Sequence, residues 1–236
     1  MNLINHLLIS ISVIILIGCN TKTSKTIETR SINQDEEISN QDEEVLNQEI
    51  KEEFKLTDDN VIDFLFEYEK NNKENKVRIY TNYGEIDVLL FSNTPYHRSN
   101  FIYLTKSNYF EGTQFYRVVN DFVIQAGNSD NIKTSLKRQK IGKYLLPNDF
   151  NKGHTHKRGM VSMPSSSIDN PYKMASPYEF FIVQKKDGAH HLDGNYTIFG
   201  TVINGMEIVD IIASLPTDER DWPLNNVYIN KVEIIN

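Results

Sequence analysis

The chain has 236 residues, enough for one domain of ordinary size with an extension or for two small domains. Its net charge of −7, without any Arg-rich run, argues against a nucleic-acid-binding protein, and its single cysteine excludes a disulfide within the chain. The acidity lies in residues 20–76, which hold 8 Lys/Arg against 16 Asp/Glu, whereas residues 77–236 have a net charge of +1. The N-terminal part and the body therefore differ in character.

Residues 1–18 are predicted to be a lipoprotein signal peptide. The run from Leu7 to Ile17 is almost wholly apolar but too short to span a bilayer as a helix, which takes about twenty residues. The sequence LIGC that ends at Cys19 resembles the bacterial lipobox, in which the cysteine is lipidated. Residues 1–6 contain no Lys or Arg, which leaves an ordinary cleaved signal or an uncleaved anchor open. We expect Cys19 to anchor the protein in the cell envelope, on the periplasmic or surface side of a bacterial membrane.

Residues 19–56 are predicted to form a disordered acidic tether. They are rich in Thr, Ser, Asn, Gln, Glu and Lys, so they cannot bury enough apolar surface to offset the entropy of the chain. Residues 57–75 follow as a docking helix, because a polar start precedes the apolar run between Val61 and Tyr68. That run is too apolar for a free helix, and we expect it to pack on the body.

Residues 76–236 are predicted to form one domain of many short strands and few helices. Helices are expected at 95–107, where threonine and proline fit the N-cap and the first helical position, and at 206–215. Residues 128–157 are expected to form a long irregular insert. The predicted strands lie at 77–81, 86–90, 115–118, 122–126, 159–163, 179–184, 197–203 and 227–235. This pattern lacks a βαβ rhythm and indicates a mostly β fold, a closed antiparallel barrel capped by two helices.

An arginine stands among apolar residues in the most informative segment, residues 115–127. The segment predicts two short strands around a polar turn, with Arg117 near Phe115, Phe122 and Val123. A guanidinium group stays charged at any working pH and is costly to desolvate, so its position needs a reason. Taken alone, a surface arginine with its stem along an amphipathic strand would explain it. The other motifs of the body favour a functional role.

The body resembles the cyclophilin family of peptidyl-prolyl cis–trans isomerases in its bacterial form. The matching motifs are YGEI at 83–86, Thr94-Pro95 with Asn100-Phe101, YFEGT at 109–113, FYRVV at 115–119, FVIQAG at 122–127, KRGM at 157–160, EFFIV at 179–183 and LDGNYTIFG at 192–200. The resemblance extends over residues 76–236, about two-thirds of the chain. The resemblance implies a closed eight-stranded antiparallel β-barrel with an α-helix over each end, and a substrate groove on the outside of the barrel.

The resemblance also implies a role for each matching side chain. Arg117 matches the catalytic arginine, and Gln125 matches the glutamine that helps to hold the substrate backbone and the arginine. The substrate-binding positions are Phe122, Val123, Phe181 and Leu192, which match the walls of the proline pocket, together with Glu179, His191 and Tyr196. No cofactor is expected. The expected partners are proline-containing unfolded or flexible polypeptides, and we expect a monomer.

The chemistry of the X–Pro bond explains the need for an arginine. Its amide rotates over a barrier near 20 kcal/mol, because the nitrogen shares its lone pair with the carbonyl group. Twisting the bond frees that lone pair, so a cation that donates a hydrogen bond to it stabilises the twisted state most. We therefore expect a prolyl isomerase that assists the folding of exported or cell-envelope proteins. The alternatives are a proline-peptide-binding chaperone or scaffold with little turnover, and a purely structural lipoprotein.

Glu179 and His191 are among the positions that depart from the family pattern. Glu179 stands where the family usually has glutamine, and an ionised glutamate can only accept hydrogen bonds. We expect it to pair with Arg117 and to make the enzyme slower or differently selective. His191 stands where many eukaryotic members have a tryptophan that contacts cyclosporin, so weak inhibition by cyclosporin is expected.

The histidines are not expected to bind a metal. His154 with His156 and His190 with His191 form two pairs in the sequence, but neither pair has a partner at ligand spacing. We expect all four to be surface-loop histidines and predict no metal site.

Overall fold

The computed structural model describes residues 54–149, 151–165 and 170–236 of the chain. The residues separate into two units, 1–51 and 52–236, and the described residues all belong to the second. The predicted signal peptide, Cys19 and nearly all of the tether lie outside the described residues and stay predictions. Among the residues that are described, no helix combines the length and the apolar character needed to cross a membrane.

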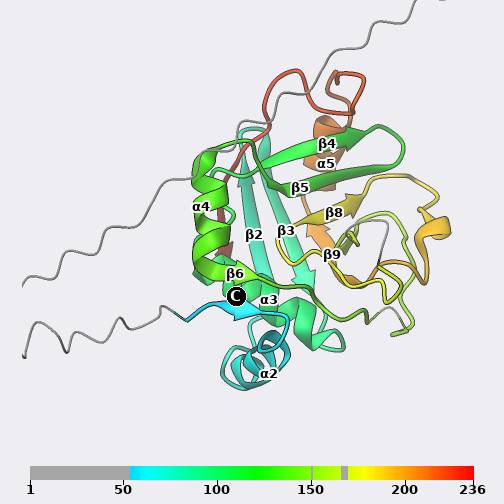
Figure 1. Ribbon diagram of the computed structural model, residues 1–236. Helices are drawn as coiled ribbons and strands as arrows, with labels where there is room; N and C mark the ends of the chain where they lie inside the picture. The colour runs from blue at the N-terminus through cyan, green and yellow to red at the C-terminus, as the bar shows by residue number, and fades with distance from the viewer. Residues whose placement is uncertain (1–53, 150, 166–169) are drawn as a thin grey trace, which may run out of the picture. The chain divides into compact units, whose positions relative to one another are not determined.

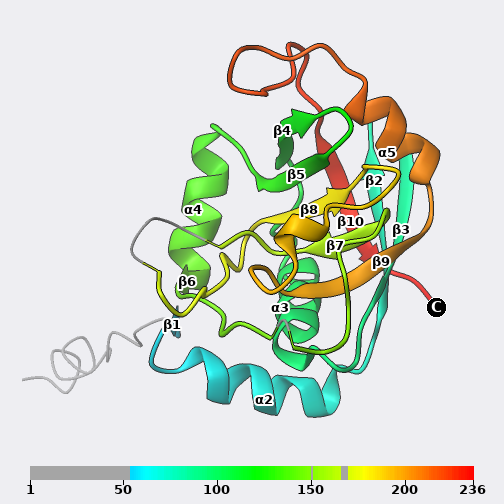
Figure 2. The same ribbon diagram turned by 90° about the vertical axis from the view of Figure 1, so that its right-hand side faces the viewer.

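The body is a nearly closed antiparallel barrel, as predicted (Figure 1 and Figure 2). In the described part of the chain, eight strands join in the order β10-β2-β3-β9-β7-β8-β5-β4. Their bounds are β2 (Lys76–Thr81), β3 (Gly84–Leu90), β4 (Gln114–Val119), β5 (Val123–Asn128), β7 (Met160–Ser162), β8 (Phe180–Val183), β9 (Ile198–Asn204) and β10 (Ile229–Ile234). The two ends of this sheet meet because the amide of Phe115 donates to Val227 and the amide of Ile229 donates to Thr113, both at 2.8 Å.

Side chains alternate between the inside and the outside of the barrel, as the two-residue period of a strand requires. On β8, Phe180 and Ile182 belong to the main core, whereas Phe181 and Val183 belong to a second, smaller apolar cluster. Val123 of β5 joins that smaller cluster. Because the interior of the barrel is filled by side chains, a ligand site has to lie on its outside.

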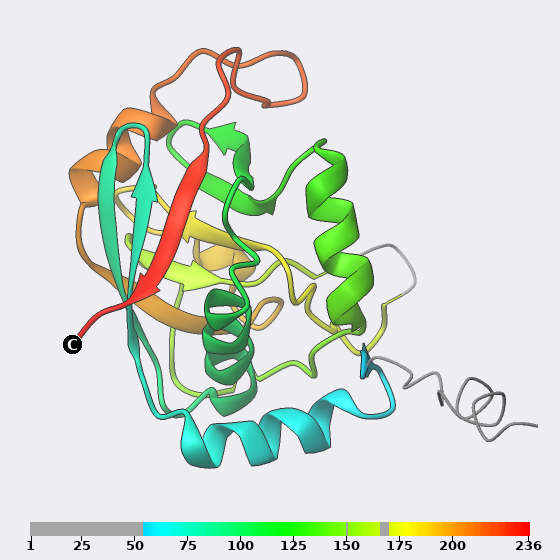
Figure 3. The same cartoon turned by 90° about the vertical axis from the view of Figure 1, so that its left-hand side faces the viewer.

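Two helices cover the ends of the barrel (Figure 3). The first is α3 (Pro95–Lys106) and the second is α5 (Met206–Ala213), close to the bounds predicted for them. Both bury side chains in the main core. The turn into α5 requires glycine, because Gly205 has a φ of 90° and an added Cβ would lie 2.2 Å from the carbonyl oxygen of Glu85.

The N-terminal helix α2 (Val61–Asn71) packs on α3. Its Phe64 meets Tyr103 of α3 edge to face, with the ring centroids 5.1 Å apart. Glu69 pairs with Arg98 of α3, whose side chain is only 4% exposed. An unpaired buried guanidinium is strongly destabilising, so α2 stabilises the body by supplying the partner of Arg98.

The segment 128–157 contains a helix, so the expectation of an irregular insert is wrong in part. α4 (Ile132–Ile141) begins after Asn131, whose side chain caps it by accepting a hydrogen bond from a first-turn amide at 2.9 Å. Its sequence, IKTSLKRQKI, has too few apolar residues at helical spacing to be recognised by pattern. Two short strands, β1 (Leu56–Thr57) and β6 (Gly142–Lys143), pair in parallel next to it.

His97 of α3 is fully buried, and its ring centroid lies 6.2 Å from that of Phe199. Burial lowers the pKa of His97 to about 3, against about 6.5 in an unfolded chain. Between these values the unfolded chain binds the extra proton, so the free energy of unfolding falls as the pH falls. We expect His97→Leu to reduce this pH dependence by about 1.4 kcal/mol per pH unit between pH 6 and pH 4.

Urea unfolding from pH 7 to pH 4 measures the slope for the wild type and for His97→Leu. Some pH dependence remains in the variant, because burial also lowers the pKa of His156. The matched control is His191→Leu, because the ring of His191 is exposed. A slope in His97→Leu equal to that of the wild type contradicts the assignment.

Candidate functional site

The outer face of β4, β5 and β8 carries a small pocket. Its volume is about 90 Å³, well below the roughly 300–1,000 Å³ of sites for drug-sized ligands. The lining residues are Arg117, Phe122, Val123, Gln125, Pro164, Phe181, Leu192 and Tyr196. The structure therefore brings together all the predicted catalytic and substrate-binding residues except Glu179 and His191. Pro164 was not predicted, and nothing in its Ser-rich surroundings marks it as a pocket residue.

Strand register explains why these side chains converge. Arg117 on β4 lies opposite Gln125 on β5, and Gln125 lies opposite Phe181 on β8. Three neighbouring strands thus place a cation, an amide and an aromatic ring in one row across the outer face. The turn between β4 and β5 contains Asp121 with a φ of 55°, which returns the chain so that Phe122 reaches the same pocket.

The far wall of the pocket comes from the 3₁₀ helix η1 (His190–Leu192) and the loop after it. Tyr196 meets Phe181 edge to face, with the ring centroids 5.7 Å apart. His191 stacks on Phe122 at 5.3 Å and so covers a pocket residue without lining the pocket itself. Its predicted contact with substrate stays a prediction.

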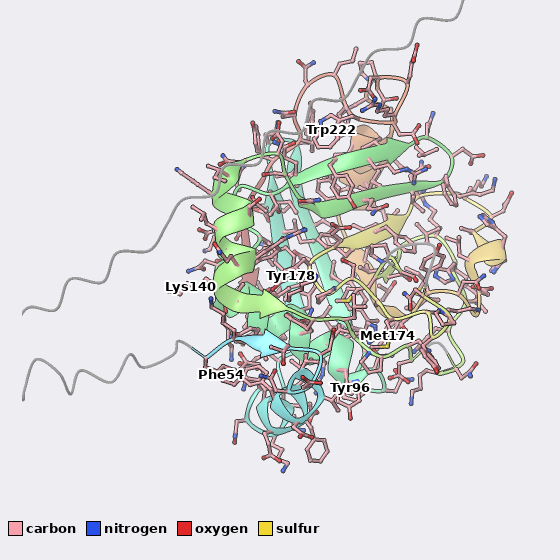
Figure 4. The ribbon with its side chains drawn as sticks, in the orientation of Figure 1. Phe54, Tyr96, Lys140, Met174, Tyr178 and Trp222 are labelled. Atoms are coloured by element: carbon pink, nitrogen blue, oxygen red, sulfur yellow. The ribbon has the colours of Figure 1, made fainter. Side chains whose placement is uncertain are left out.

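Arg117 pairs with Asp221 at 3.1 Å. The two side chains are 38% and 41% exposed, so the pair contributes little stability and can open to a ligand. The backbone of Asp221 is held in place, because its carbonyl oxygen accepts a hydrogen bond from the backbone amide of Val118 at 2.8 Å. The next residue, Trp222, lies beside β4, with its ring 5.8 Å from that of Tyr116 (Figure 4). Asp221 was not predicted from the sequence, because no motif surrounds it.

Glu179 does not pair with Arg117, so that expectation is wrong. It accepts hydrogen bonds from the hydroxyl of Tyr116 at 2.8 Å, from Nδ2 of Asn128 at 3.2 Å and from Nη2 of Arg138 at 3.3 Å. Its side chain is 16% exposed and is not part of the pocket wall. The partner Arg138 belongs to α4, a helix that was not predicted from the sequence, so the ion pair could not be predicted either.

Tyr116 connects Glu179 with the pocket. Its hydroxyl donates to Oε2 of Glu179 and accepts a hydrogen bond from Nε2 of Gln125. Burial raises the pKa of Tyr116 well above its usual value, and the charge of Glu179 raises it further. The phenol therefore keeps its proton, and the pocket is joined to α4 by a chain of hydrogen bonds.

His156 is fully buried, so the expectation of a surface histidine is wrong at this position. Its Nδ1 lies 2.7 Å from a carboxylate oxygen of Asp193, and its Nε2 lies 3.0 Å from the hydroxyl of Ser162. These residue types also occur in hydrolase triads, but Ser162 is fully buried and out of reach of a substrate. The ring lies nearly parallel to Phe181 at 6.0 Å, so the trio supports the pocket from behind.

A larger cavity of about 510 Å³ lies near α4, β1 and β6. Leu56, Arg138 and Tyr178 are among its lining residues, and Tyr178 is labelled in Figure 4. None of the predicted catalytic or substrate-binding residues, all of which the structure describes, lines this cavity. Within the described residues, no group of three His, Cys, Asp or Glu side chains is arranged to hold a metal ion.

The small pocket combines an apolar recess, the donors of one permanently charged guanidinium, and an amide. The recess can hold a small ring without hydrogen bonds, since its walls are Phe122, Val123, Phe181 and Leu192. Arginine can place several donors against a group whose electrons rearrange. Such an arrangement suits a change of conformation in a bound ligand, which needs electrostatic stabilisation and no covalent step.

Comparison with known proteins gives one result. A family model described as "Cyclophilin type peptidyl-prolyl cis-trans isomerase/CLD" matches residues 76–234. A peptidyl-prolyl cis-trans isomerase of Acinetobacter baylyi is 35% identical over 166 residues, which cover 67% of this chain and 84% of the relative. Peptidyl-prolyl cis-trans isomerase-like 2 of Rhizopus delemar is 34% identical over 171 residues, which cover 72% of this chain but only 30% of that longer protein.

Solved structures agree with the sequence relatives. A cyclophilin type peptidyl-prolyl cis-trans isomerase of Cryptosporidium parvum, crystallised in the presence of the dipeptide Ala-Pro, superimposes with a TM-score of 0.57 at 29% identity. The match covers 68% of this chain and 99% of that one. The body of the chain thus corresponds to a whole isomerase domain.

Proposed function

The chain belongs to the cyclophilin family of peptidyl-prolyl cis–trans isomerases, and from this premise we propose that it turns X–Pro bonds of exported or cell-envelope proteins while Cys19 holds it at a bacterial membrane. Proline isomerisation takes tens of seconds and can limit folding, so proteins that fold outside the cytoplasm benefit from a catalyst. The observation that carries the proposal is one pocket in which Arg117 adjoins an apolar recess.

We assign the catalytic role to Arg117. When the X–Pro bond twists, its nitrogen regains the lone pair, and the guanidinium donates a hydrogen bond to that nitrogen. Because this bond is stronger in the twisted state than in the planar state, it lowers the barrier. The ion pair with Asp221 leaves the other N–H groups of the guanidinium available. Because both side chains are partly exposed, a bound substrate can take the place of Asp221.

The apolar walls hold the proline ring while the acyl side of the bond rotates. Phe181 forms the floor, since its ring is supported from behind by His156. Phe122 and Leu192 stand at the sides. Gln125, opposite Arg117 on the neighbouring strand, offers its amide to the substrate backbone. In the described part of the chain, the two ends of the eight-stranded sheet hydrogen bond to each other, so neither offers a long free edge to a second copy, which supports a monomer.

Lipidation of Cys19 is tested with the full chain in a bacterium fed an alkyne-tagged fatty acid. We expect the label on the wild type and recovery of the protein with the membranes after a high-salt wash. Cys19→Ser removes the only cysteine and is expected to lose the label and to leave the membranes. A wild type without label, or equal label on Cys19→Ser, contradicts the anchor and leaves the isomerase assignment intact.

A proline-peptide-binding scaffold with little turnover is the second candidate. It is favoured by Glu179, which replaces the usual glutamine and is bound to Arg138. The two functions differ in one measurement, because a scaffold binds an X–Pro peptide with a measurable Kd but does not accelerate its isomerisation.

A further inference from the structure

The hydrogen bonds between α4 and the pocket form one directed chain. Arg138 donates to Oε1 of Glu179 at 3.3 Å, and the hydroxyl of Tyr116 donates to Oε2 at 2.8 Å. Nε2 of Gln125 in turn donates to the hydroxyl of Tyr116. The chain therefore runs from Gln125 through Tyr116 to Glu179, with Arg138 at its far end.

The charge of Glu179 fixes this direction. A carboxylate can only accept, so the single hydroxyl proton of Tyr116 must point to Glu179. The hydroxyl oxygen then faces Gln125 as an acceptor, which only the NH₂ group of that amide can satisfy. The carbonyl oxygen of Gln125 is left on the other side of the amide.

We propose that Glu179 is a positioning residue that acts through Tyr116 to orient the amide of Gln125, so that Gln125 presents an acceptor to the bound peptide. This inference rests on the proposed role of the pocket as the isomerase site. An acceptor selects a donor, and proline has no N–H of its own. The donor is a backbone N–H of a residue next to the proline, and the enzyme prefers peptides that keep this N–H.

A glutamine at position 179 would reverse the direction of these hydrogen bonds. Oε1 of residue 179 accepts from both Arg138 and Asn128, and the amide of Asn128 is itself fixed, because its oxygen accepts from the backbone of Ser129 at 2.9 Å. The oxygen of the substituted amide therefore stays with these donors, and its NH₂ group turns to Tyr116. The hydroxyl of Tyr116 must then donate to Gln125, whose amide flips and presents its NH₂ group to the peptide.

The test compares acetyl-Ala-Ala-Pro-Ala-amide with two analogues, one N-methylated on the residue before the proline and one on the residue after it. Exchange NMR measures kcat and KM for each peptide. For the wild type we expect kcat/KM to fall about three- to ten-fold on at least one analogue, the effect of one lost hydrogen bond. Glu179→Gln is expected to lose this discrimination. A role of Glu179 in folding alone would lower all three rates equally and leave their ratios unchanged.

Two variants make the test specific. Glu111→Gln, an exposed glutamate outside the pocket, is expected to keep the ratios of the wild type. Tyr116→Phe removes the hydroxyl that connects Glu179 with Gln125 but keeps the ring. In a Tyr116→Phe protein, we therefore expect Glu179→Gln to cause no further change in the ratios of kcat/KM between the three peptides. A Glu179→Gln variant with the ratios of the wild type, or a wild type that does not discriminate, overturns the proposal.

The side-chain NH₂ resonances of Gln125 give a readout that needs no turnover, assigned by their absence in Gln125→Ala. We expect Glu179→Gln to move them, and Glu111→Gln to leave them in place. If the wild type turns over no peptide, the proposed isomerase function is contradicted. The NH₂ resonances of Gln125 still show in that case whether Glu179 sets the orientation of the amide. Resonances that stay in place in Glu179→Gln refute the positioning role.

Discussion

Arg117→Ala is expected to reduce kcat/KM on an X–Pro peptide by at least about 100-fold, which corresponds to ~2.7 kcal/mol of transition-state stabilisation. The apolar recess remains in this variant, so the proline ring still binds and KM changes little. The loss falls on kcat, because the guanidinium contacts the nitrogen most strongly in the twisted state. A protease-coupled assay, in which only the trans peptide is cleaved, measures both constants.

Two further arginine changes serve as controls. Arg117→Lys keeps the charge but replaces the planar fork with a single ammonium group, and we expect an intermediate rate. Arg220→Ala removes an exposed arginine from the loop that carries Asp221 and is expected to keep the rate of the wild type. A loss of less than about three-fold in Arg117→Ala points instead to the binding scaffold.

Adjacent phenylalanines on β8 are expected to give opposite phenotypes. Phe180 is 1% exposed and meets Phe101 and Phe110 edge to face, with ring centroids 5.5 Å and 5.8 Å away. Phe180→Ala leaves a cavity inside the barrel, and we expect it to lower the free energy of unfolding by about 3–5 kcal/mol. Urea unfolding at pH 7 measures this change, and the surviving folded protein should keep its kcat.

Phe181→Ala acts on the other side of the same strand. It removes the floor of the pocket, so we expect KM to rise at least about ten-fold while the loss of stability is smaller than in Phe180→Ala. Phe180→Leu and Phe181→Leu are matched controls that retain most of the apolar volume. We expect a smaller loss of stability in Phe180→Leu and a smaller rise of KM in Phe181→Leu than in the alanine variants. Equal effects of the two alanine substitutions on KM would show that the inside and outside of the barrel have been assigned wrongly.

The barrel could be read from the sequence because its evidence is local. Aromatic and β-branched residues on both sides of a polar turn mark the strands that carry Arg117 and Gln125, and proline at the first helical position marks α3. The motif order then places both residues in one pocket, which the structure shows to be lined by them together. Local patterns of this kind are set by the chain on each side of a residue, so a single sequence contains them.

The partners of the pocket residues could not be predicted, since they come from distant segments. Asp221 reaches Arg117 from the loop before β10, and Arg138 reaches Glu179 from a helix with hardly any apolar face. A charged side chain has no periodic signal that names its counter-ion. The burial of His156 could not be predicted either, because it also depends on a distant segment. This histidine is enclosed only when the loop after η1, with Asp193 and Tyr196, folds over it.

The way the sheet closes has a consequence for biosynthesis. Tyr80 on β2 hydrogen bonds with Glu233 on β10, a residue 153 positions later in the chain. A nascent polypeptide emerges N-terminus first, so β2 cannot pair with β10 until the residues up to Ile234 have been synthesised. Until then β2 and β4 expose unpaired backbone to other chains, and contacts so far apart in sequence form slowly. The protein is therefore expected to bind holding chaperones while it is being synthesised.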